Sequence, residues 1–280
     1  MKIHLVSDSQ VVIENVPNFD LFETFTCGQC FRWNQSAECE FIGVAFGKVV
    51  KILKQNNSII LKGSSVASDF ELLWKNYFDL NTDYNKIKIK LSKLDSNLNL
   101  ACKYAPGIRI LRQEPWEALC SFIISQNNNI PRIKGIIERL CACFGEEIEP
   151  GLFSFPSYKT LSGLEKSDLI PIKCGFRDDY ILDAAKKLTA GEVSFVKIAN
   201  SNISDARTEL MKIKGVGPKV AECTLLYGFH KLDAFPVDVW MKRAMESLFP
   251  DKEISFFGDY AGIAQQYIFH YSRMNPHLAK

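Results

Sequence analysis

Apolar and polar residues alternate over much of residues 1–65, with the period of two that is typical of β-strands. The segments "KVVKILK" and "SIILKG" are rich in β-branched residues, and the "QNNS" between them is typical of a hairpin turn. The segments "CFRWNQ" and "FIGVAFG" fit the same pattern. We therefore expect a small antiparallel sheet in this region.

The pattern changes to helical spacing from about Asp69 onward. "SDFELLWKNYF" has a serine or aspartate N-cap followed by apolar residues at helical intervals. The lysines and isoleucines of "NKIKIKLSKLDSNL" alternate as in a strand, but its length and lack of turn residues favour a helix equally. Beyond residue 100, segments such as "PWEALCSFIISQ", "IPRIKGIIERLCACFG", "DDYILDAAKKLTAG" and "YAGIAQQYIFHYSRM" predict a series of short helices.

These patterns predict an α+β protein. We expect residues 1–100 to form a small N-terminal antiparallel β-sheet domain with flanking helices. This domain should pack on a mostly α-helical body of two subdomains over residues 101–280, with the functional cleft between the two subdomains.

Composition narrows the class of protein. The chain has 280 residues, enough for two or three subdomains, and a formal net charge of +2, too small to indicate a nucleic-acid partner by itself. Its nine scattered cysteines, an odd number, are typical of free thiols in a reducing compartment. Cys27 and Cys30 form a single C-x-x-C without a second pair, which argues against a zinc site. The chain begins without the apolar core of a signal peptide and has no membrane-spanning run, so we expect a soluble intracellular protein.

Residues 204–228, "SDARTELMKIKGVGPKVAECTLLYG", predict two helices joined by a tight hairpin. Gly215 and Gly217 permit positive φ and close backbone approach, and Pro218 suits the first turn of the second helix. The free amides at that helix start form a site for a phosphate, so the hairpin could hold a nucleic-acid backbone. Three basic residues raise the local positive potential: Arg207, Lys212 and Lys214. "GVG" alone would favour a C-capped helix that runs into another helix.

A second motif lies downstream of this hairpin. Lys219 follows the hairpin, and nineteen residues later Asp238 follows a Pro-Val pair in "AFPVDVWMKR", where it suits an N-cap. The combination resembles the signature of the helix-hairpin-helix superfamily of DNA base-excision glycosylases, and more narrowly the chain is similar to the 8-oxoguanine DNA glycosylases. Six segments resemble family motifs in family order: "TCGQCFRW", "GIRILRQEPWEALCSFIISQNNNIPRI", "CGFRDDYI", "IKGVGPKVAEC", "FPVDVWM" and "YAGIAQQYIF". The run "SQNNNI" is particularly specific to the family, because we expect no generic structural role for three asparagines before a helix.

The resemblance implies a bifunctional glycosylase and strand-cleaving lyase that acts on 8-oxoguanine in duplex DNA, with Lys219 and Asp238 as catalytic residues. As an uncharged amine, Lys219 would attack the anomeric carbon, displace the base and leave a Schiff base, after which β-elimination cleaves the strand. Desolvation and the positive end of its own helix favour the uncharged amine. Asp238 would stabilise positive charge on the sugar. Without the resemblance, a solvent-exposed lysine and a plain N-cap would be the ordinary interpretation.

The resemblance also implies a pocket for the flipped base. The carbonyl oxygen of Gly28 would accept a hydrogen bond from the N7–H that 8-oxoguanine carries and guanine lacks. Gln265 would bind the Watson–Crick edge of the base and Phe269 its face, since residues four apart on a helix can line one cavity. Cys223 and Tyr227, on successive turns of the helix after the hairpin, would line the same pocket, although we expect methionine in the family where Tyr227 stands.

Other positions resemble residues that contact DNA around the flipped base and its orphaned cytosine. Phe176 would act as an aromatic wedge, where many members have tyrosine. Trp240 stands where a histidine would contact a phosphate, and we assign it no contact. The predicted DNA-binding residues are Asn127, Arg132, Phe176, Arg177, Gly215 and Gly217.

We predict that no cofactor is required. An iron–sulfur cluster of the kind that follows the Pro-Val-Asp segment in related glycosylases is excluded, because no cysteine follows Cys223. The resemblance implies a structural monovalent cation held by the backbone carbonyls of Met211, Ile213 and Val216. The expected partner is duplex DNA containing 8-oxoguanine, bound by a monomer with no membrane association, in the cytoplasm of a bacterium and associated with the nucleoid.

Two other functions compete with this prediction. A monofunctional glycosylase for alkylated bases would use water and the aspartate alone, and Lys219 argues against it. A non-catalytic helix-hairpin-helix protein would bind the DNA backbone only. It would explain Gly215 and Gly217, but neither Asp238 nor the pair Gln265 and Phe269.

Overall fold

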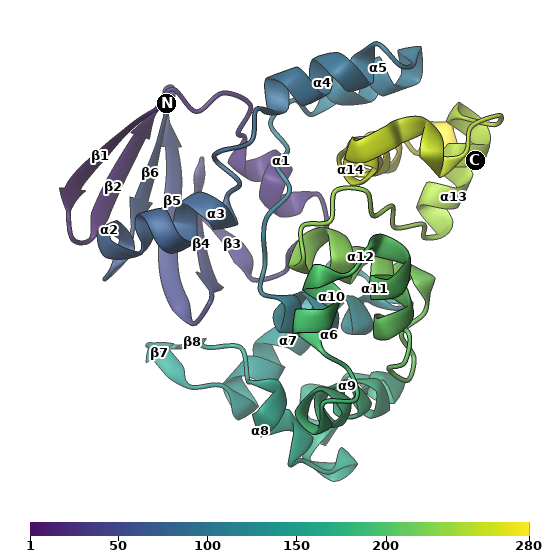
Figure 1. The fold of residues 1–280 in the computed structure, drawn as a ribbon. Coiled ribbons are helices and arrows are strands. Elements are labelled where there is room, and N and C mark those ends of the chain that lie inside the picture. The colour runs from purple at the N-terminus through teal and green to yellow at the C-terminus, as the bar shows by residue number, and fades with distance from the viewer. Residues whose placement is uncertain (280) are drawn as a thin grey trace.

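A six-stranded antiparallel sheet forms the N-terminal region of the computed structural model, which describes residues 1–279 (Figure 1). The strands lie in the order β1-β2-β6-β5-β4-β3, so the predicted sheet is confirmed. Their bounds are β1 Lys2–Ser7, β2 Gln10–Glu14, β3 Trp33–Ala37, β4 Glu40–Ala45, β5 Lys48–Gln55 and β6 Ser58–Lys62.

The neighbouring strands β5 and β6 show why the alternation specifies a sheet. Val50 and Ile52 on β5, and Ile59 and Leu61 on β6, are at most 2% exposed, while the residues between them are less buried. The two strands pair antiparallel around a tight turn in which Asn56 has a φ of +53°. Burial of one face therefore fixes which residues point inward.

Helices make up most of the remaining chain. Their bounds are α1 Leu21–Thr26, α2 Val66–Asp69, α3 Lys75–Tyr77, α4 Tyr84–Ser92, α5 Ser96–Tyr104, α6 Pro115–Ser125, α7 Ile130–Phe144, α8 Tyr158–Ser162, α9 Asp178–Ala190, α10 Phe195–Asn200, α11 Ile203–Leu210, α12 Pro218–Gly228, α13 Val239–Leu248 and α14 Ala261–Met274. A π-helical turn, Phe70–Trp74, joins α2 to α3, 3-10 turns cover Lys166–Ile172, Gly175–Arg177, Ile254–Tyr260 and Pro276–Ala279, and a small hairpin pairs β7 (Glu147–Glu149) with β8 (Leu152–Phe153).

The ambiguous segment "NKIKIKLSKLDSNL" is helical and forms parts of α4 and α5. Asp83 and Asp95 each cap one of these helices by accepting two backbone amides. Buried residues of both helices, such as Ile87 and Leu98, belong to the same apolar cluster as the helical body, and α5 packs against α14. The helices α4 and α5 therefore turn their apolar faces toward the helical body and share its core.

The short helix α1 was not predicted. Asp20 caps it by accepting the amide of Glu23 at 3.0 Å. A helix of six residues is too short to show helical periodicity, and it lies between strands in the sequence.

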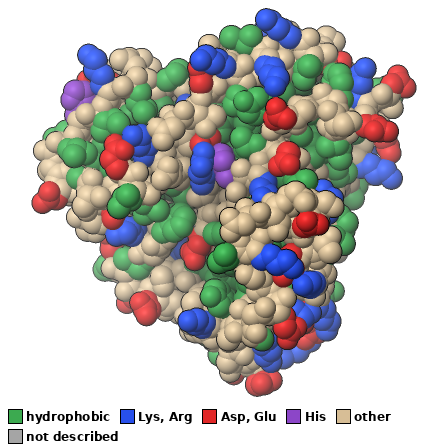
Figure 2. All heavy atoms as spheres, in the orientation of Figure 1, with side chains coloured by type: hydrophobic (Ala, Val, Ile, Leu, Met, Phe, Trp, Pro, Cys, Tyr) green, Lys and Arg blue, Asp and Glu red, His purple; other side chains and the backbone are tan. Residues whose placement is uncertain are grey.

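Charged side chains of both signs are interspersed on the face of the molecule shown in Figure 2, in keeping with the small net charge. Over residues 1–279, no helix combines the length and apolar character needed to cross a membrane.

Candidate active site

The predicted helix-hairpin-helix is present as α11, a tight turn and α12. Gly215 has a φ of +75°, and a Cβ atom at this position would lie 2.3 Å from the ring of Tyr180, so glycine is required twice over. Gly217 has a φ of −95°, so the positive φ that glycine permits is not used at this position. Within 4 Å of a Cβ placed on Gly217 the described residues leave open space, and Pro218 begins α12 as predicted.

Lys219, in the first turn of α12, points into the protein interior. Its side chain is half-buried, and its Nζ donates a hydrogen bond to Ser125 Oγ at 3.0 Å. The same Nζ lies 5.2 Å from the centroid of the Phe122 ring. The amine is therefore held against α6. Sequence reasoning missed Ser125, although it begins the quoted run "SQNNNI".

The residues predicted for catalysis and base binding meet in one place. A pocket of about 50 Å³ is lined by Gly28, Phe122, Lys219, Cys223, Tyr227, Pro236, Asp238, Gln265 and Phe269. All seven residues in those two predicted groups are in this set. A second hollow of about 280 Å³ adjoins it, with Gly28, Phe122, Lys219, Asp238 and Phe269 in both linings.

Asp238 is the N-cap of α13, as predicted, and its Oδ1 accepts the amide of Met241 at 2.7 Å. The loop before it is fastened to α12 by Glu222, a buried residue three positions after Lys219 on that helix. One carboxylate oxygen of Glu222 accepts the amide of Phe235 at 2.7 Å, and the other pairs with Arg207 of α11. Glu222 therefore ties the two helices of the motif to the loop that carries the aspartate.

Gly28 lies in a loop whose backbone is held on both sides. Its φ of +92° favours glycine. The carbonyl before it, on Cys27, accepts a bond from Gln266 Nε2 at 3.2 Å. The carbonyl after it, on Gln29, accepts a bond from Gln113 Nε2 at 2.7 Å. These two glutamines, which sequence reasoning missed, leave the orientation of Gly28 little freedom.

Tyr227 connects this loop to α12. Its hydroxyl donates to Oε1 of Gln266, and its ring stacks on Phe122 with centroids 5.2 Å apart. Burial raises the pKa of Tyr227 well above its ordinary value, so the hydroxyl remains a donor. Tyr227, at a position where the resemblance led us to expect methionine, thus both lines the pocket and supports Gly28 through one glutamine.

Two other pocket residues offer polar atoms to an occupant. Burial raises the pKa of the Cys223 thiol to about 11 against the opposing effect of Lys219, so the thiol is protonated at neutral pH. Gln265 is 4% exposed, and its Oε1 has no hydrogen-bond partner within residues 1–279. A buried amide oxygen without a partner carries a desolvation cost that a donor on a ligand would relieve.

The predicted DNA-binding residues divide into two groups. Asn127 and Arg132 are exposed, and Phe176 is 52% exposed with the guanidinium of Arg177 4.5 Å from its ring. Arg177 itself is only 2% exposed and donates to the carbonyls of Gln126, Asn127 and Cys174. The predicted contact of Arg177 with DNA is therefore not available in this conformation, because its guanidinium braces the loop before α7.

The asparagine run has structural roles that we did not expect. Asn129 caps α7 by accepting the amide of Arg132 at 3.0 Å. Asn128 donates to the carbonyl of Ile124 at 3.1 Å. Only Asn127, which has a φ of +47° and is exposed, is free of these local bonds. The expectation of no generic role is wrong for two of the three asparagines.

The hairpin carbonyls predicted to hold a cation lie on one turn. The carbonyl of Ile213 accepts the amide of Val216 at 3.1 Å, which leaves a second lone pair for an ion. Cation binding by Met211, Ile213 and Val216 stays a prediction.

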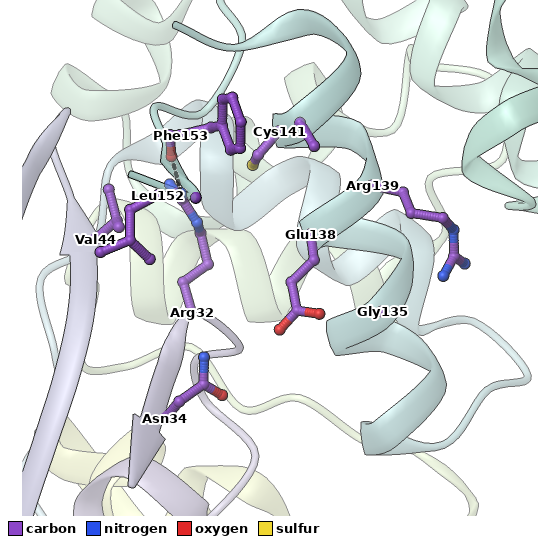
Figure 3. Close-up of a pocket in the computed structure, with 11 residues that line it drawn as sticks. Arg32, Asn34, Val44, Gly135, Glu138, Arg139, Cys141, Leu152 and Phe153 are labelled. Carbon is purple, nitrogen blue, oxygen red and sulfur yellow. Dashed lines mark hydrogen bonds between the residues drawn. The ribbon is translucent and has the colours of Figure 1, made fainter. Parts of the chain in front are cut away.

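A separate hollow of about 360 Å³ lies between the sheet and α7, and holds none of the predicted site residues (Figure 3). Arg32 reaches across it to the carbonyl of Phe153 and pairs with Glu117 at 3.3 Å. The carboxylate of Glu138 and the amide of Asn34 lie on its wall. Arg32 thus joins the strand region to the helical body.

Comparison with known proteins gives family matches over most of the chain. Residues 11–119 match the family model described as "8-oxoguanine DNA glycosylase, N-terminal domain", and residues 120–255 match "HhH-GPD superfamily base excision DNA repair protein". The "N-glycosylase/DNA lyase" of Saccharomyces cerevisiae is 33% identical over 253 residues, which cover 80% of this chain and 66%, just under two thirds, of the yeast protein.

Two solved structures are similar along nearly the whole chain. MBOgg1 in complex with a low affinity DNA ligand is 42% identical, with a TM-score of 0.93 and coverage of 99% of this chain and 100% of that chain. The Clostridium acetobutylicum 8-oxoguanine glycosylase/lyase, in complex with double-stranded DNA containing cytosine opposite 8-oxoguanine, is 38% identical, with a TM-score of 0.92 and coverage of 99% of each chain.

Proposed function

Because this chain belongs to the 8-oxoguanine DNA glycosylase family of the helix-hairpin-helix superfamily, we propose that it excises 8-oxoguanine from duplex DNA and then cleaves the strand. In this proposal Lys219 forms a Schiff base with the sugar, and β-elimination follows. The observation that carries the proposal is the shared pocket, which brings Lys219, Asp238, Gly28 and Phe269 together from four separate segments.

The chemistry requires a nucleophile, a stabilising charge and a proton acceptor. The Lys219 nitrogen bonds to C1′ of the nucleotide as the C1′–N9 bond breaks, and the base leaves with the bonding electrons and takes up a proton. Opening of the sugar ring gives the protonated imine. Loss of a proton from C2′ then expels the 3′ phosphate and breaks the strand. Asp238 stabilises the positive charge that develops on the sugar in the first step.

The pocket walls supply groups that fit an 8-oxoguanine base. The carbonyl of Gly28 accepts a hydrogen bond from N7–H, and the partnerless Oε1 of Gln265 accepts a hydrogen bond from the Watson–Crick edge. Phe269 covers the face of the base. Guanine, which has no proton on N7, would leave the Gly28 carbonyl without a hydrogen-bond donor. The inner pocket is smaller than the adjoining hollow, so the nucleotide would occupy both.

Borohydride trapping on a duplex with 8-oxoguanine opposite cytosine tests the proposal. We expect a covalent protein–DNA adduct that is lost in Lys219→Gln. Base release without trapping would instead support the monofunctional glycosylase, and binding without base release would support the non-catalytic module. The half-buried position of Lys219 against the pocket favours the first outcome.

The proposal also includes a monomer that requires no cofactor for the chemistry, acting on DNA in the bacterial cytoplasm and associated with the nucleoid. We expect base release to be unchanged after treatment with EDTA. Light scattering during size-exclusion chromatography should give the mass of a single chain, and a dimer mass would contradict this part.

A further inference from the structure

Arg273 extends the row of pocket residues on α14. Gln265, Phe269 and Arg273 are spaced four residues apart, so they lie along one face of the helix. Arg273 lines the outer hollow together with Lys219 and Asp238. Its Nη1 lies 3.6 Å from the position that a Cβ atom on Gly28 would occupy. The guanidinium is therefore a neighbour of the reacting groups.

Arg273 is half-buried, and its guanidinium takes part in no hydrogen bond or ion pair with any residue from 1 to 279. It is also not needed to end its own helix. Asn275 donates backbone bonds to the carbonyls of Tyr271 and Ser272, and its side chain bonds to Tyr271 again. An arginine that is partly withdrawn from water without a protein acceptor is suited to an anion from outside the chain.

The position of Arg273 indicates that it would contact the sugar–phosphate backbone rather than the base. Arg273 lines the outer hollow but not the inner pocket, where Gln265, Cys223 and Tyr227 lie. Lys219 and Asp238 line both, so in the proposed function the reacting sugar would lie at the junction of the two spaces. The outer hollow is then the side on which the sugar–phosphate backbone lies. Arg273 and Lys219 are the two cationic residues of its lining.

We infer that Arg273 binds a phosphate flanking the everted nucleotide, and so anchors the backbone beside the sugar that Lys219 attacks. This inference rests on the proposed function for the everted nucleotide. A guanidinium binds phosphate through two parallel hydrogen bonds, so it would fix orientation as well as add charge.

The salt dependence of binding gives the first test. We would measure dissociation constants for a duplex with 8-oxoguanine opposite cytosine over a range of salt, using wild type, Arg273→Gln, Arg273→Lys and a charge control, Lys62→Gln. Lys62 is exposed on β6 and lines neither space. We expect Arg273→Gln to reduce the log–log salt slope by about 0.9, since one phosphate contact is lost. Arg273→Lys should retain the slope with weaker binding, and Lys62→Gln should match wild type.

An uncharged analogue of the phosphate shows which phosphate Arg273 contacts. A methylphosphonate would replace the phosphate on the 5′ or the 3′ side of the lesion, and binding would be measured for wild type and Arg273→Gln. At one of these positions the methylphosphonate should weaken DNA binding by wild type but have little further effect on DNA binding by Arg273→Gln. An unchanged salt slope in Arg273→Gln, or additive losses at both positions, would overturn the inference.

Different results would contradict the proposed function and the inference about Arg273. If wild type neither prefers the 8-oxoguanine duplex nor gives a trapped adduct, the proposed function is wrong, and the inference about an everted nucleotide falls with it. If wild type is trapped but the salt slope does not depend on Arg273, only the inference is wrong. Matching thermal unfolding midpoints for the variants show that any difference arises in binding.

Discussion

The pocket has two walls that are built in different ways. The helix wall, Lys219, Cys223 and Tyr227, comes from successive turns of α12, so ordinary helical spacing places all three side chains on one face. The loop wall is the segment around Gly28, which has no periodic pattern. It is held by Gln113 and by Gln266, a residue 239 positions away from its acceptor on Cys27.

The difference shows which parts of a site depend on local sequence and which depend on tertiary structure. The helix wall needs only that α12 forms and that its neighbours pack. The loop wall needs hydrogen bonds between segments that meet only in the folded chain. We therefore expect changes near the helix wall to alter the chemical step, and changes near the loop wall to alter base discrimination.

Acid should loosen the end of the helix wall more than any single substitution below. His230, just beyond α12, has both ring nitrogens without hydrogen-bond partners among residues 1–279. Burial lowers the pKa of His230 to about 4 from 6.5, and the nearby Arg112 acts in the same direction. Asp79, 3.5 Å away, has the opposite effect, but its charge is already paired with Arg112.

The direction of the pH dependence follows from these pKa values. Above pH 6.5 the imidazole is neutral in both states and its contribution does not change. As the pH falls below 6.5 the unfolded chain binds the proton first, so stability decreases until the folded pKa of about 4 is reached. The total loss should be about 3 kcal/mol. We expect urea unfolding to show this loss in wild type but not in His230→Asn, which tolerates the positive φ of this position. If the free energy of unfolding decreased equally with falling pH in wild type and His230→Asn, the expected role of His230 would be contradicted.

Replacing Glu222 should disturb the helix wall and the Asp238 loop together. Glu222→Leu leaves the amide of Phe235 without its acceptor and Arg207 without its partner. We expect a loss of about 2 kcal/mol in the free energy of unfolding, together with slower base release. Glu222→Gln retains an acceptor for the amide and should lose less than half as much. Equal base release rates in wild type and Glu222→Leu would show that the tie does not position Asp238.

Removing the Tyr227 hydroxyl should affect the loop wall. Tyr227→Phe leaves Oε1 of Gln266 buried without its donor, at a cost of about 1–2 kcal/mol. Because Gln266 holds the carbonyl before Gly28, the ratio of rates on 8-oxoguanine and guanine should fall. Cleavage of a duplex that already contains an abasic site should stay near the wild-type rate. Tyr158→Phe, outside both pocket linings, is the control. An unchanged ratio of the rates on 8-oxoguanine and guanine would show that Tyr227 does not contribute to base discrimination.

Ser125→Ala should have the smallest effect. It removes the acceptor of the 3.0 Å hydrogen bond from Lys219 Nζ and leaves the amine less well oriented. We expect single-turnover base release to slow by about threefold to tenfold, or roughly 1 kcal/mol, with unchanged binding. Ser121→Ala, one turn earlier on α6 and outside both linings, should behave as wild type. A loss of binding rather than rate would contradict the orienting role.

The sequence was sufficient for features encoded by local pattern. Period-two alternation anticipated the sheet, and helical spacing placed Lys219 and Cys223 on one face of a helix. That these two residues and Asp238 line one pocket was implied by the family resemblance. The N-cap role of Asn129 also followed from ordinary capping preferences, but we attributed the whole run to the family motif.

Features that depend on distant segments could not be predicted. Nothing near Gly28 in the sequence indicates that Gln113 and Gln266 will hold its neighbours. The inward turn of Arg177 depends on the carbonyls of a loop 50 residues away. The assignment of α4 and α5 to the helical core likewise depends on where α14 packs.

Peptide mapping of the borohydride-reduced adduct tests the central claim most directly, because it identifies the nitrogen that meets the sugar. Wild-type protein would be trapped on a duplex with 8-oxoguanine opposite cytosine, digested and analysed by mass spectrometry. We expect the nucleotide remnant on Lys219. A remnant on Lys212 or Lys214 of the hairpin, or on the N-terminal amine, would contradict it.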